Sequence, residues 1–269
     1  MQAQIQVPAR PCVLVFAGVD PSGGAGISAD IEAIAAMGAH ALPVVTVLTV
    51  QDNDRVFAVH PVAAELVLQQ AQALVDKISI KTVKIGIVGT RANAVAIASI
   101  ITQLRQHNPH LPVVLDPVLA SGHGDALSVD DAMQLLNPLL PLATLIAPNL
   151  PEARALCDGE ISIESQAQQL RHRGCPHVLI KGGHGNGDDV VNRWFGPAAS
   201  KEWHWPRLAG QFHGSGCTLA SAIAGLLARG LDMRAAIEGG QEYCQKTLAS
   251  AYAIAPGQRI PCRAGTMMN

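Results

Sequence analysis

Short apolar runs of strand length alternate with segments of helical periodicity along most of this chain. Residues 12–17 and 43–50 are two such runs, and a strand that is buried on both faces of a sheet has this composition. Between them Ile27, Ile31 and Ile34 lie at i, i+4 and i+7, which is the spacing of one apolar helix face. Repeated alternation of this kind predicts an α/β fold, with a mostly parallel sheet covered by helices on both sides.

The remaining predicted elements continue this alternation. Helices are predicted at residues 61–77, 91–105, 130–140, 151–157, 163–173, 219–229 and 233–251, and strands at 82–88, 111–116, 143–147, 177–181, 190–195 and, as an edge strand, 202–205. Pro61 is expected near the first position of its helix, and the tail is expected to be short and irregular. No repeat, low-complexity tract or linker divides the chain, so we expect one domain spanning residues 1–269.

The amino-acid composition argues against several classes of function. Only 15% of the residues are charged, the formal net charge is −2 and 3% are aromatic, which argues against a nucleic-acid or anionic-membrane surface. The six cysteines form no CxxC pair, and this fits reduced thiols better than a disulfide framework or a zinc site. Neither a signal-peptide pattern nor an apolar run of membrane-spanning length is visible. We therefore expect a soluble cytoplasmic protein.

The most distinctive stretch is His-Gly-Ser-Gly-Cys-Thr at residues 213–218, directly before an apolar helical segment. Gly214, Ser215 and Gly216 are small enough for successive N–H groups to point into one concavity, and a helix N-terminus attracts anions. Cys217 falls in the first helical turn, where the same field favours a thiolate. The stretch is either an anion-binding loop with one nucleophile or base, or a glycine-rich turn with a buried structural cysteine.

A second glycine-rich turn, at residues 18–26, follows the first predicted strand. Strand, glycine-rich turn and helix begin a βαβ unit, in which ligands bind beyond the carboxyl end of the strand. Asp20 and Asp30 bracket this turn. Each is either a carboxylate of a ligand site or a local residue, Asp20 as a turn former before Pro21 and Asp30 as a complement to the helix dipole.

Further polar residues follow other predicted strands. Asp116 ends one strand, Asn149 and Glu152 follow the next, and Lys181 ends a third. Grouped carboxylates suit Mg²⁺ and a lysine suits phosphate oxygens, although capping and solvated roles are equally open. Together with the anion-binding loop, these residues point to phosphoryl transfer. The Walker A motif is absent, and the absence of GxGxxG argues against an NAD enzyme.

Six motifs together resemble one family. They are Gly-Val-Asp-Pro-Ser-Gly-Gly-Ala-Gly-Ile at residues 18–27, Lys-Ile-Gly at 84–86, Leu-Asp-Pro-Val at 115–118, Pro-Asn-Leu-Pro-Glu at 148–152, Lys-Gly-Gly-His at 181–184 and the stretch at 213–218. From about residue 13 to residue 252 the chain closely resembles the hydroxymethylpyrimidine/phosphomethylpyrimidine kinases of the ribokinase-like superfamily. The resemblance implies a three-layer αβα sandwich and an enzyme of thiamine biosynthesis that is commonly dimeric. It also implies phosphorylation, with ATP and Mg²⁺, of 4-amino-5-hydroxymethyl-2-methylpyrimidine and then of its monophosphate.

The resemblance assigns one set of residues to the substrate. The pyrimidine pocket would be lined by Asp20, Asp30, Gln51, Ile87 and Val118. The amide of Gln51 offers both a donor and an acceptor to an aminopyrimidine edge, and Ile87 and Val118 would enclose the ring.

A second set would bind the nucleotide and its metal ion. Lys181, Asn149, Glu152 and Ser215 would contact ATP, and Asp116 and Glu152 would face Mg²⁺. This grouping is implied by the position of each residue in its motif.

The resemblance assigns catalysis to Lys181, Cys217 and an anion hole that contains Gly214 and Gly216. Cys217 would accept the hydroxymethyl proton, because a helix N-terminus can lower the pKa of a thiol from about 8.5 towards neutrality. Many sugar kinases of the superfamily carry Asp at this position.

Departures from the family pattern leave alternatives open. The anion hole reads Gly-Ser-Gly-Cys where Gly-Thr-Gly-Cys is usual, residues 52–54 are unusually acidic, and His123 stands where Ser is common. An enzyme that performs only the first phosphorylation is therefore open. So are a pyridoxal or pyridoxine kinase, against which Gln51 and Cys217 argue, and a non-catalytic ligand-binding protein. His123 and His184 are interpreted as local residues.

Overall fold

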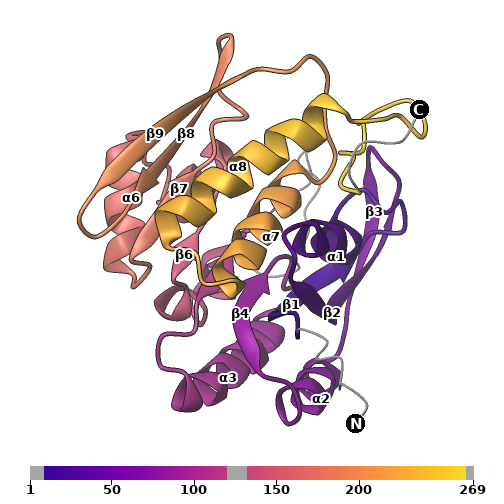
Figure 1. Cartoon of the computed structure of the whole chain (residues 1–269), viewed down its shortest axis with the longest axis vertical. Helices are drawn as coiled ribbons and strands as arrows, with labels where there is room; N and C mark the ends of the chain where they lie inside the picture. The colour runs from indigo at the N-terminus through magenta and orange to yellow at the C-terminus, as the bar shows by residue number, and fades with distance from the viewer. Residues whose placement is uncertain (1–8, 120–131, 265–269) are drawn as a thin grey trace, which may run out of the picture.

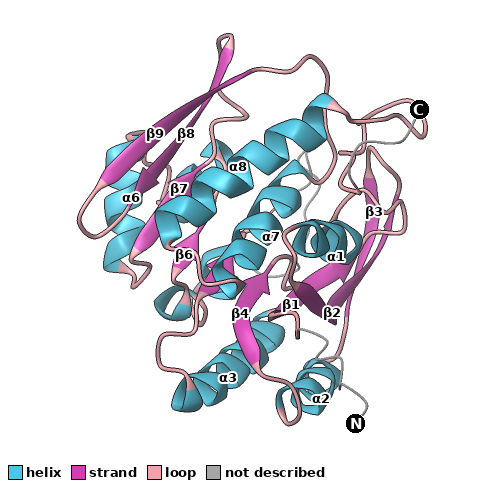
Figure 2. Ribbon diagram, in the orientation of Figure 1, coloured by secondary structure: helices cyan, strands magenta, loops and turns pink. Residues whose placement is uncertain are grey.

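The computed structural model describes residues 9–119 and 132–264, and at its centre these residues form a nine-stranded sheet in the order β3-β2-β1-β4-β5-β6-β7-β8-β9 (Figure 1 and Figure 2). The strands are β1 (Cys12–Val19), β2 (His40–Gln51), β3 (Val56–Pro61), β4 (Ile80–Ile85), β5 (Val113–Leu115), β6 (Leu145–Ile146), β7 (His177–Ile180), β8 (Asp189–Phe195) and β9 (Ser200–Pro206). Neighbours from β2 to β7 in this order pair in parallel, whereas β3, β8 and β9 join antiparallel. The predicted α/β fold with a mostly parallel sheet is confirmed.

Helices cover both faces of the sheet and produce three layers. One face carries α1 (Gly26–Ala36), α7 (Ser215–Ala228) and α8 (Met233–Ala249), and the other carries α2 (Ala64–Val75), α3 (Arg91–His107), α4 (Ala132–Leu136), α5 (Leu150–Leu156) and α6 (Ile163–His172). In Figure 1, α7 and α8 run side by side across the sheet. This arrangement is the predicted three-layer αβα sandwich. In the two described ranges, no helix has both the length and the apolar character that crossing a membrane requires.

The position of β1 between the two helix layers explains why its sequence is apolar without interruption. Val13, Val15 and Ala17 pack against the layer of α1, α7 and α8, whereas Leu14 and Phe16 pack against the opposite layer. Successive side chains of a strand point to opposite faces, so a strand with helices on both sides buries both sets of side chains and is mostly apolar. Burial of each large apolar side chain contributes roughly 1.5–3 kcal/mol to stability.

The prediction that Pro61 opens a helix is wrong. Pro61 ends β3, an edge strand that the sequence did not predict, and α2 begins at Ala64. Because β3 pairs only with β2, its Phe57 remains 67% exposed and its apolar pattern is weak. Proline is tolerated at the end of an edge strand because no further ladder bond is required of it.

Three of the elements predicted towards the C-terminus are present in the structure. The edge strand predicted at 202–205 is confirmed as β9, and the last two helices are confirmed as α7 and α8. Residues 120–131, which include His123 and the start of the helix predicted at 130–140, lie outside the described residues. The tail, expected to be irregular, carries two isolated β-bridges, Phe212 to Arg259 and Tyr252 to Ile260.

The order of the strands creates a crevice beside β1. The chain leaves β1 through α1 to β2 on one side, and β4 lies on the other side of β1. Ligands of doubly wound sheets bind at such a switch point, beyond the carboxyl ends of the strands. Because β1, β4, β5, β6 and β7 are parallel, the polar motifs that follow them meet at this one edge.

Candidate active site

Two adjoining cavities open beyond the carboxyl ends of the parallel strands. The smaller has a volume of about 190 Å³ and is lined by residues that follow β1, β4 and β5, by the end of β2 and by the start of α7. The larger, of about 400 Å³, is lined mainly by β8, β9, α7, α8 and the segment that joins β9 to α7. Six residues line both cavities and therefore lie where the two meet: Asn149, Lys181, His184, Phe212, Ser215 and Gly216.

Asp20 organises the glycine-rich turn after β1. Its Oδ1 accepts a hydrogen bond from the N–H of Ser22 (2.8 Å), and its Oδ2 accepts one from the N–H of Ala25 (2.7 Å). His213 Nε2 lies 2.8 Å from the same Oδ2. Burial would raise the pKa of Asp20, but the hydrogen bonds from His213 and Ser22 outweigh it and lower this pKa to about 2. Asp20 is thus a turn-forming residue that also borders the smaller cavity.

We expect Asp20→Asn to lower the free energy of unfolding by about 2 kcal/mol at pH 7, because one pKa unit corresponds to about 1.4 kcal/mol. The folded-state pKa is depressed, so the stabilisation is complete above the unfolded-state pKa of about 4 and is lost as the pH falls towards 2. Urea unfolding of both proteins across this range measures the difference. A difference that stays constant at every pH would contradict the assignment.

The turn before α7 has a backbone that requires glycine. Gly214 has a φ of 71°, in the left-handed region, and a Cβ there would lie 2.1 Å from the carbonyl oxygen of Gly24. Thr218 N–H donates to Gly214 O at 2.9 Å. The N–H groups of the first turn, at residues 215–217, have no acceptor inside the helix, and these residues line the smaller cavity. This is the geometry of an anion-binding site.

Lys181 lies at the junction of the two cavities. Its ammonium donates to Asp116 Oδ1 at 2.7 Å, and both side chains are largely buried. A Cβ on Gly216 would lie 3.2 Å from Lys181 Nζ, so the lysine reaches the start of α7. Burial would lower the pKa of Lys181, but the charges of Asp116 and Glu152 raise it. A permanent positive charge therefore faces the anion-binding turn.

Asn149 and Glu152 form a capping box at the start of α5. Glu152 N–H donates to Asn149 Oδ1 and Asn149 N–H donates to Glu152 Oε2, each at 2.8 Å. The capping alternative is therefore correct, yet both residues also line the smaller cavity. Burial raises the pKa of Glu152 to about 7, although the charge of Lys181 opposes the increase.

Two carboxylates at this edge of the sheet, those of Asp116 and Glu152, suit Mg²⁺. Asp116 Oδ2 is buried and has no hydrogen-bond partner among the described residues, while Glu152 lines the same cavity. Proteins commonly hold Mg²⁺ through one or two carboxylates together with substrate phosphates and waters. Asp116 and Glu152 fit such a site.

The predicted lowering of the Cys217 pKa is wrong. Burial raises the pKa of this thiol to about 11, and the nearby charge of Lys84, which acts in the opposite direction, does not compensate. Asp30 and Asp116 raise it further. Cys217 lines the smaller cavity, so the group that faces this cavity at neutral pH is a thiol and not a thiolate.

Asp30 is not a lining residue, contrary to expectation. It is fully buried, and its carboxylate accepts hydrogen bonds from Lys84 Nζ (2.8 and 2.9 Å) and from Ser221 Oγ (2.6 Å). Ser221 lies one helical turn beyond Cys217 on α7, so the ion pair sits behind the thiol. The Lys-Ile-Gly motif contains Lys84, but its partner is 54 residues away and no local pattern identifies it.

The other residues assigned to the substrate lie at the smaller cavity. Gln51, Ile87 and Val118 all line it. Phe212 and Val56, which belong to none of the six motifs, line it as well.

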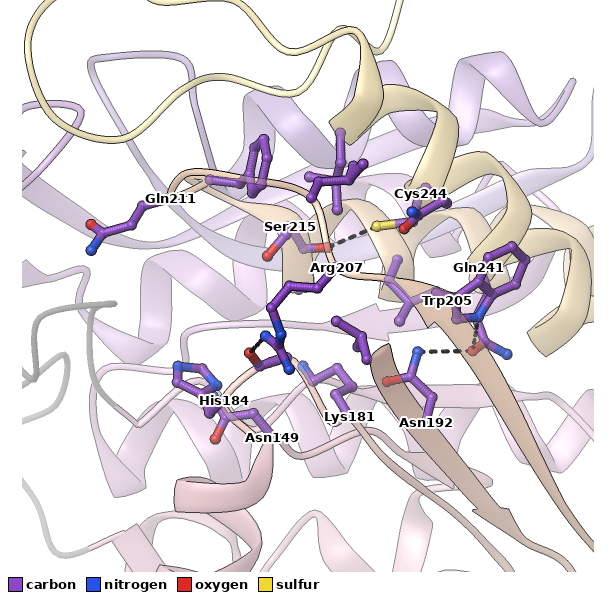
Figure 3. Close-up of a pocket in the computed structure, with 18 of the residues that line it drawn as sticks. Asn149, Lys181, His184, Asn192, Trp205, Arg207, Gln211, Ser215, Gln241 and Cys244 are labelled. Carbon is purple, nitrogen blue, oxygen red and sulfur yellow. Dashed lines mark hydrogen bonds between the residues drawn. The ribbon is translucent and has the colours of Figure 1, made fainter. Parts of the chain in front are cut away.

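The larger cavity, drawn in Figure 3, is also lined by residues of β8, β9 and α8 that belong to none of the six motifs. Gln241 on α8 accepts hydrogen bonds at Oε1 from Asn192 Nδ2 (2.8 Å) and from Trp205 Nε1 (3.0 Å). Arg207 donates to the backbone oxygens of Gly183 and Gly187. Single polar residues on β8, β9 and α8 therefore converge only once the antiparallel hairpin has folded against α8.

Comparison with known proteins identifies the family. The family model described as Phosphomethylpyrimidine kinase matches residues 20–261. The chain is 38% identical over 254 residues to the hydroxymethylpyrimidine/phosphomethylpyrimidine kinase of Mycobacterium tuberculosis, covering 92% of this chain and 91% of that protein. It is 34% identical over 254 residues to the protein of the same name from Escherichia coli, covering 92% and 94%.

Solved structures agree with the sequence comparison. The phosphomethylpyrimidine kinase of Clostridium difficile is 31% identical with a TM-score of 0.76, covering 89% of this chain and 100% of that one. The Bacillus subtilis pyridoxal kinase has the same fold, with a TM-score of 0.82 at 24% identity over 93% of this chain and 96% of that one. The resemblance carried by the six motifs is thus confirmed, and the chain belongs to the phosphomethylpyrimidine kinase family.

Proposed function

We propose that this chain is a kinase of thiamine biosynthesis. It transfers the γ-phosphoryl group of ATP to 4-amino-5-hydroxymethyl-2-methylpyrimidine, and then transfers a second phosphoryl group to the resulting monophosphate. The observation that carries the proposal is the meeting of two cavities at Lys181 and the first turn of α7. An acceptor in the smaller cavity and a nucleotide in the larger one bring their reacting groups together there. Membership of the family supports both substrates.

Three residues of the smaller cavity suit the pyrimidine. Gln51 offers a donor and an acceptor to the amino group and ring nitrogen of the substrate. Ile87 and Val118, which line the same cavity, provide apolar surface for the two faces of the ring. A neutral ring held between apolar side chains, with one amide for orientation, is a common form of small-molecule site.

Lys181 and the turn before α7 supply charge stabilisation for the transfer. The transferred group carries its charge on three oxygens, and catalysis depends on donors fixed in place before the reaction. A Cβ on Gly216 would lie 3.2 Å from Lys181 Nζ, and residues 215–217 line the smaller cavity together with Lys181, so the ammonium and the N–H groups of this turn are close to the same point. Asp116 and Glu152 would hold Mg²⁺, which when bound neutralises charge on the ATP phosphates.

In this proposal the proton acceptor for the first phosphorylation is the deprotonated form of Cys217, which is the minor form at neutral pH because burial raises the pKa of the thiol to about 11. The hydroxymethyl group must lose its proton as it attacks. Cys217, at the start of α7, lines the smaller cavity, which we call the acceptor cavity. No covalent bond to the enzyme is needed. In the second phosphorylation the attacking group is a phosphate oxygen, which is already ionised and needs little help from a base.

One assay tests the proposal and separates it from its rivals. The purified chain is incubated with Mg·ATP and, separately, with the hydroxymethylpyrimidine, its monophosphate and pyridoxal, while ADP and phosphorylated products are followed. Turnover of both pyrimidines is expected. Turnover of the first alone would limit the enzyme to one step, turnover of pyridoxal alone would support the pyridoxal kinase alternative, and no turnover would support a binding protein.

We further propose that the enzyme is a cytoplasmic homodimer. Leu48, Val50 and Phe57 are at least half exposed along β2 and the edge strand β3, and such apolar surface marks interaction sites. None of the six cysteines, all of which lie in the described ranges, is in a disulfide bond, and this suits a reducing compartment. Sedimentation equilibrium should give twice the mass of the chain, and Phe57→Glu should reduce this to the mass of the monomer. A monomeric wild type would contradict the proposal.

A further inference from the structure

The last described segment, residues 252–263, crosses the loops that border the acceptor cavity, and we refer to it as the C-terminal strap. Tyr252 and Ile260 exchange backbone hydrogen bonds of 3.0 and 2.8 Å, which close the strap on itself. Cys262 N–H donates to Thr247 O on α8 at 3.0 Å. These hydrogen bonds therefore fix the strap near both of its ends.

The strap is hydrogen-bonded to the loop before α7. His213 N–H donates to Arg259 O and Arg259 N–H donates to Gln211 O, each at 2.9 Å. The Arg259 guanidinium lies 4.8 Å from the centre of the Phe212 ring. Since Phe212 and His213 line the acceptor cavity, the strap fixes one wall of it.

The strap also holds the loop after β2. The buried side chain of Asn53 donates to Pro256 O at 3.1 Å and to Gln258 O at 3.0 Å. Asn53 lies two residues beyond Gln51, which lines the acceptor cavity. Two separate loops of the cavity are thus attached to the same segment.

Arg263, at the end of the strap, lies where the two glycine-rich turns meet. Its side chain is 0% exposed. Nε donates to Thr218 Oγ1 at 2.8 Å, Nη2 donates to Gly24 O, and Nη1 faces Glu32 Oε2 at 3.3 Å. Thr218 follows the anion-binding turn, and Gly24 lies in the turn after β1. One guanidinium therefore joins the two turns directly.

The planar shape of the guanidinium group suits the simultaneous contact of Arg263 with both turns. Arginine presents several donors in one rigid plane, whereas a lysine ammonium is a point charge on a flexible stem. A Cβ on Gly214 would lie 3.0 Å from Arg263 Nη2 and 2.1 Å from Gly24 O, so the two turns and the guanidinium are in close contact. Two nitrogens of the planar fork, Nε and Nη2, donate to Thr218 Oγ1 and Gly24 O at the same time.

We propose that Arg263 is a positioning residue for phosphoryl transfer. It holds the start of α7 against the turn after β1, so that the N–H groups of residues 215–217 converge on the point that Lys181 faces. This inference rests on the proposed function of the site. Arg263 lies just beyond residues 20–261, which match the family model, and it lines neither of the two cavities described above.

The test compares Arg263→Lys and Arg263→Gln with Tyr243→Phe. Tyr243 Oη donates to the backbone oxygen of Arg263 at 3.0 Å, so its loss loosens the same strap and leaves the guanidinium contacts intact. We expect both Arg263 variants to lower kcat for both phosphorylations by about 10- to 100-fold, because a displacement of about 1 Å in a catalytic group has an effect of this size. KM for ATP should change little, and Tyr243→Phe should keep the kcat of the wild type.

Hydrogen exchange provides a readout that does not depend on turnover. Peptides covering residues 22–26 and 213–218 should exchange faster in both Arg263 variants than in the wild type or Tyr243→Phe. An unchanged kcat in Arg263→Lys, or an equal loss in Tyr243→Phe, would overturn the inference. If the wild type does not phosphorylate the pyrimidine, the proposed function fails. The exchange rates alone then decide whether Arg263 positions the turns. Unchanged exchange in the Arg263 variants would overturn that role.

Discussion

Replacing Cys217 with alanine is expected to slow the first phosphorylation by about 10²- to 10⁴-fold, the contribution of a general base, and to slow the second far less. The reason is the difference between the two acceptors: a hydroxymethyl group must lose a proton as it attacks, whereas a phosphate monoester is already ionised. Steady-state rates with each pyrimidine, at saturating Mg·ATP, measure both effects. Equal losses with the two substrates would remove Cys217 from the role of proton acceptor.

The pH dependence of the first phosphorylation gives an independent measurement. Burial raises the pKa of Cys217 to about 11 against the opposing charge of Lys84, and the base is the deprotonated form. The rate should therefore rise as the pH increases from 7 to 10 and should show no plateau in this range. The rate of Cys217→Ala should lack this increase.

Two further variants at this position serve as controls. Cys217→Ser keeps the size of the side chain but has no accessible anion, so it should behave like alanine. Cys217→Asp supplies a carboxylate that is ionised at neutral pH, as in many sugar kinases of the superfamily, and should restore part of the first phosphorylation. It should also move the pH profile of this step towards acid.

The sequence was sufficient for features that are repeated or local. Runs such as the one in β1 identify buried strands because both faces of the sheet are covered, and parallel pairing then brings the residues that follow each strand to one edge. For this reason Asp116, Asn149 and Lys181, which are far apart in the chain, were predicted to be neighbours and do line one cavity.

Features that depend on the packing of distant elements escaped prediction. Asp30 looks like a pocket residue in the sequence, but the contact of α1 with β4 and α7 buries it against Lys84 and Ser221. Cys217 has the helix N-terminus that lowers a thiol pKa, yet burial by the same contact raises it. Arg263 is one of two arginines in a tail that carries no motif, and its significance arises only from the groups of distant elements that surround it.

Lys181→Met is expected to lower kcat for both phosphorylations by about 10²- to 10³-fold, because a fixed positive charge at the transferred group acts in each step. This pattern differs from that of Cys217→Ala, which affects mainly one step. Methionine keeps much of the length of the side chain, so the change removes the ammonium and leaves the packing of the stem. Rates with the hydroxymethylpyrimidine and with its monophosphate should fall in parallel.

The same variant should also lose stability. Lys181 donates to Asp116 at 2.7 Å, and both side chains are largely buried. Removal of one partner of a buried pair leaves an uncompensated charge and costs about 3–5 kcal/mol. Adding Asp116→Asn to Lys181→Met should restore most of this stability, as measured by urea unfolding, but none of the activity.

A matched surface lysine provides the control for both measurements. Lys201 also donates to a carboxylate, that of Glu238 at 2.9 Å, but these side chains are 27% and 40% exposed. Surface pairs contribute only about 0–1 kcal/mol, so Lys201→Met should keep the stability and the kcat of the wild type within these limits. If Lys181→Met lost stability but kept the kcat of the wild type, the lysine would be a structural partner of Asp116. The charge at the transferred phosphoryl group would then have to come from elsewhere.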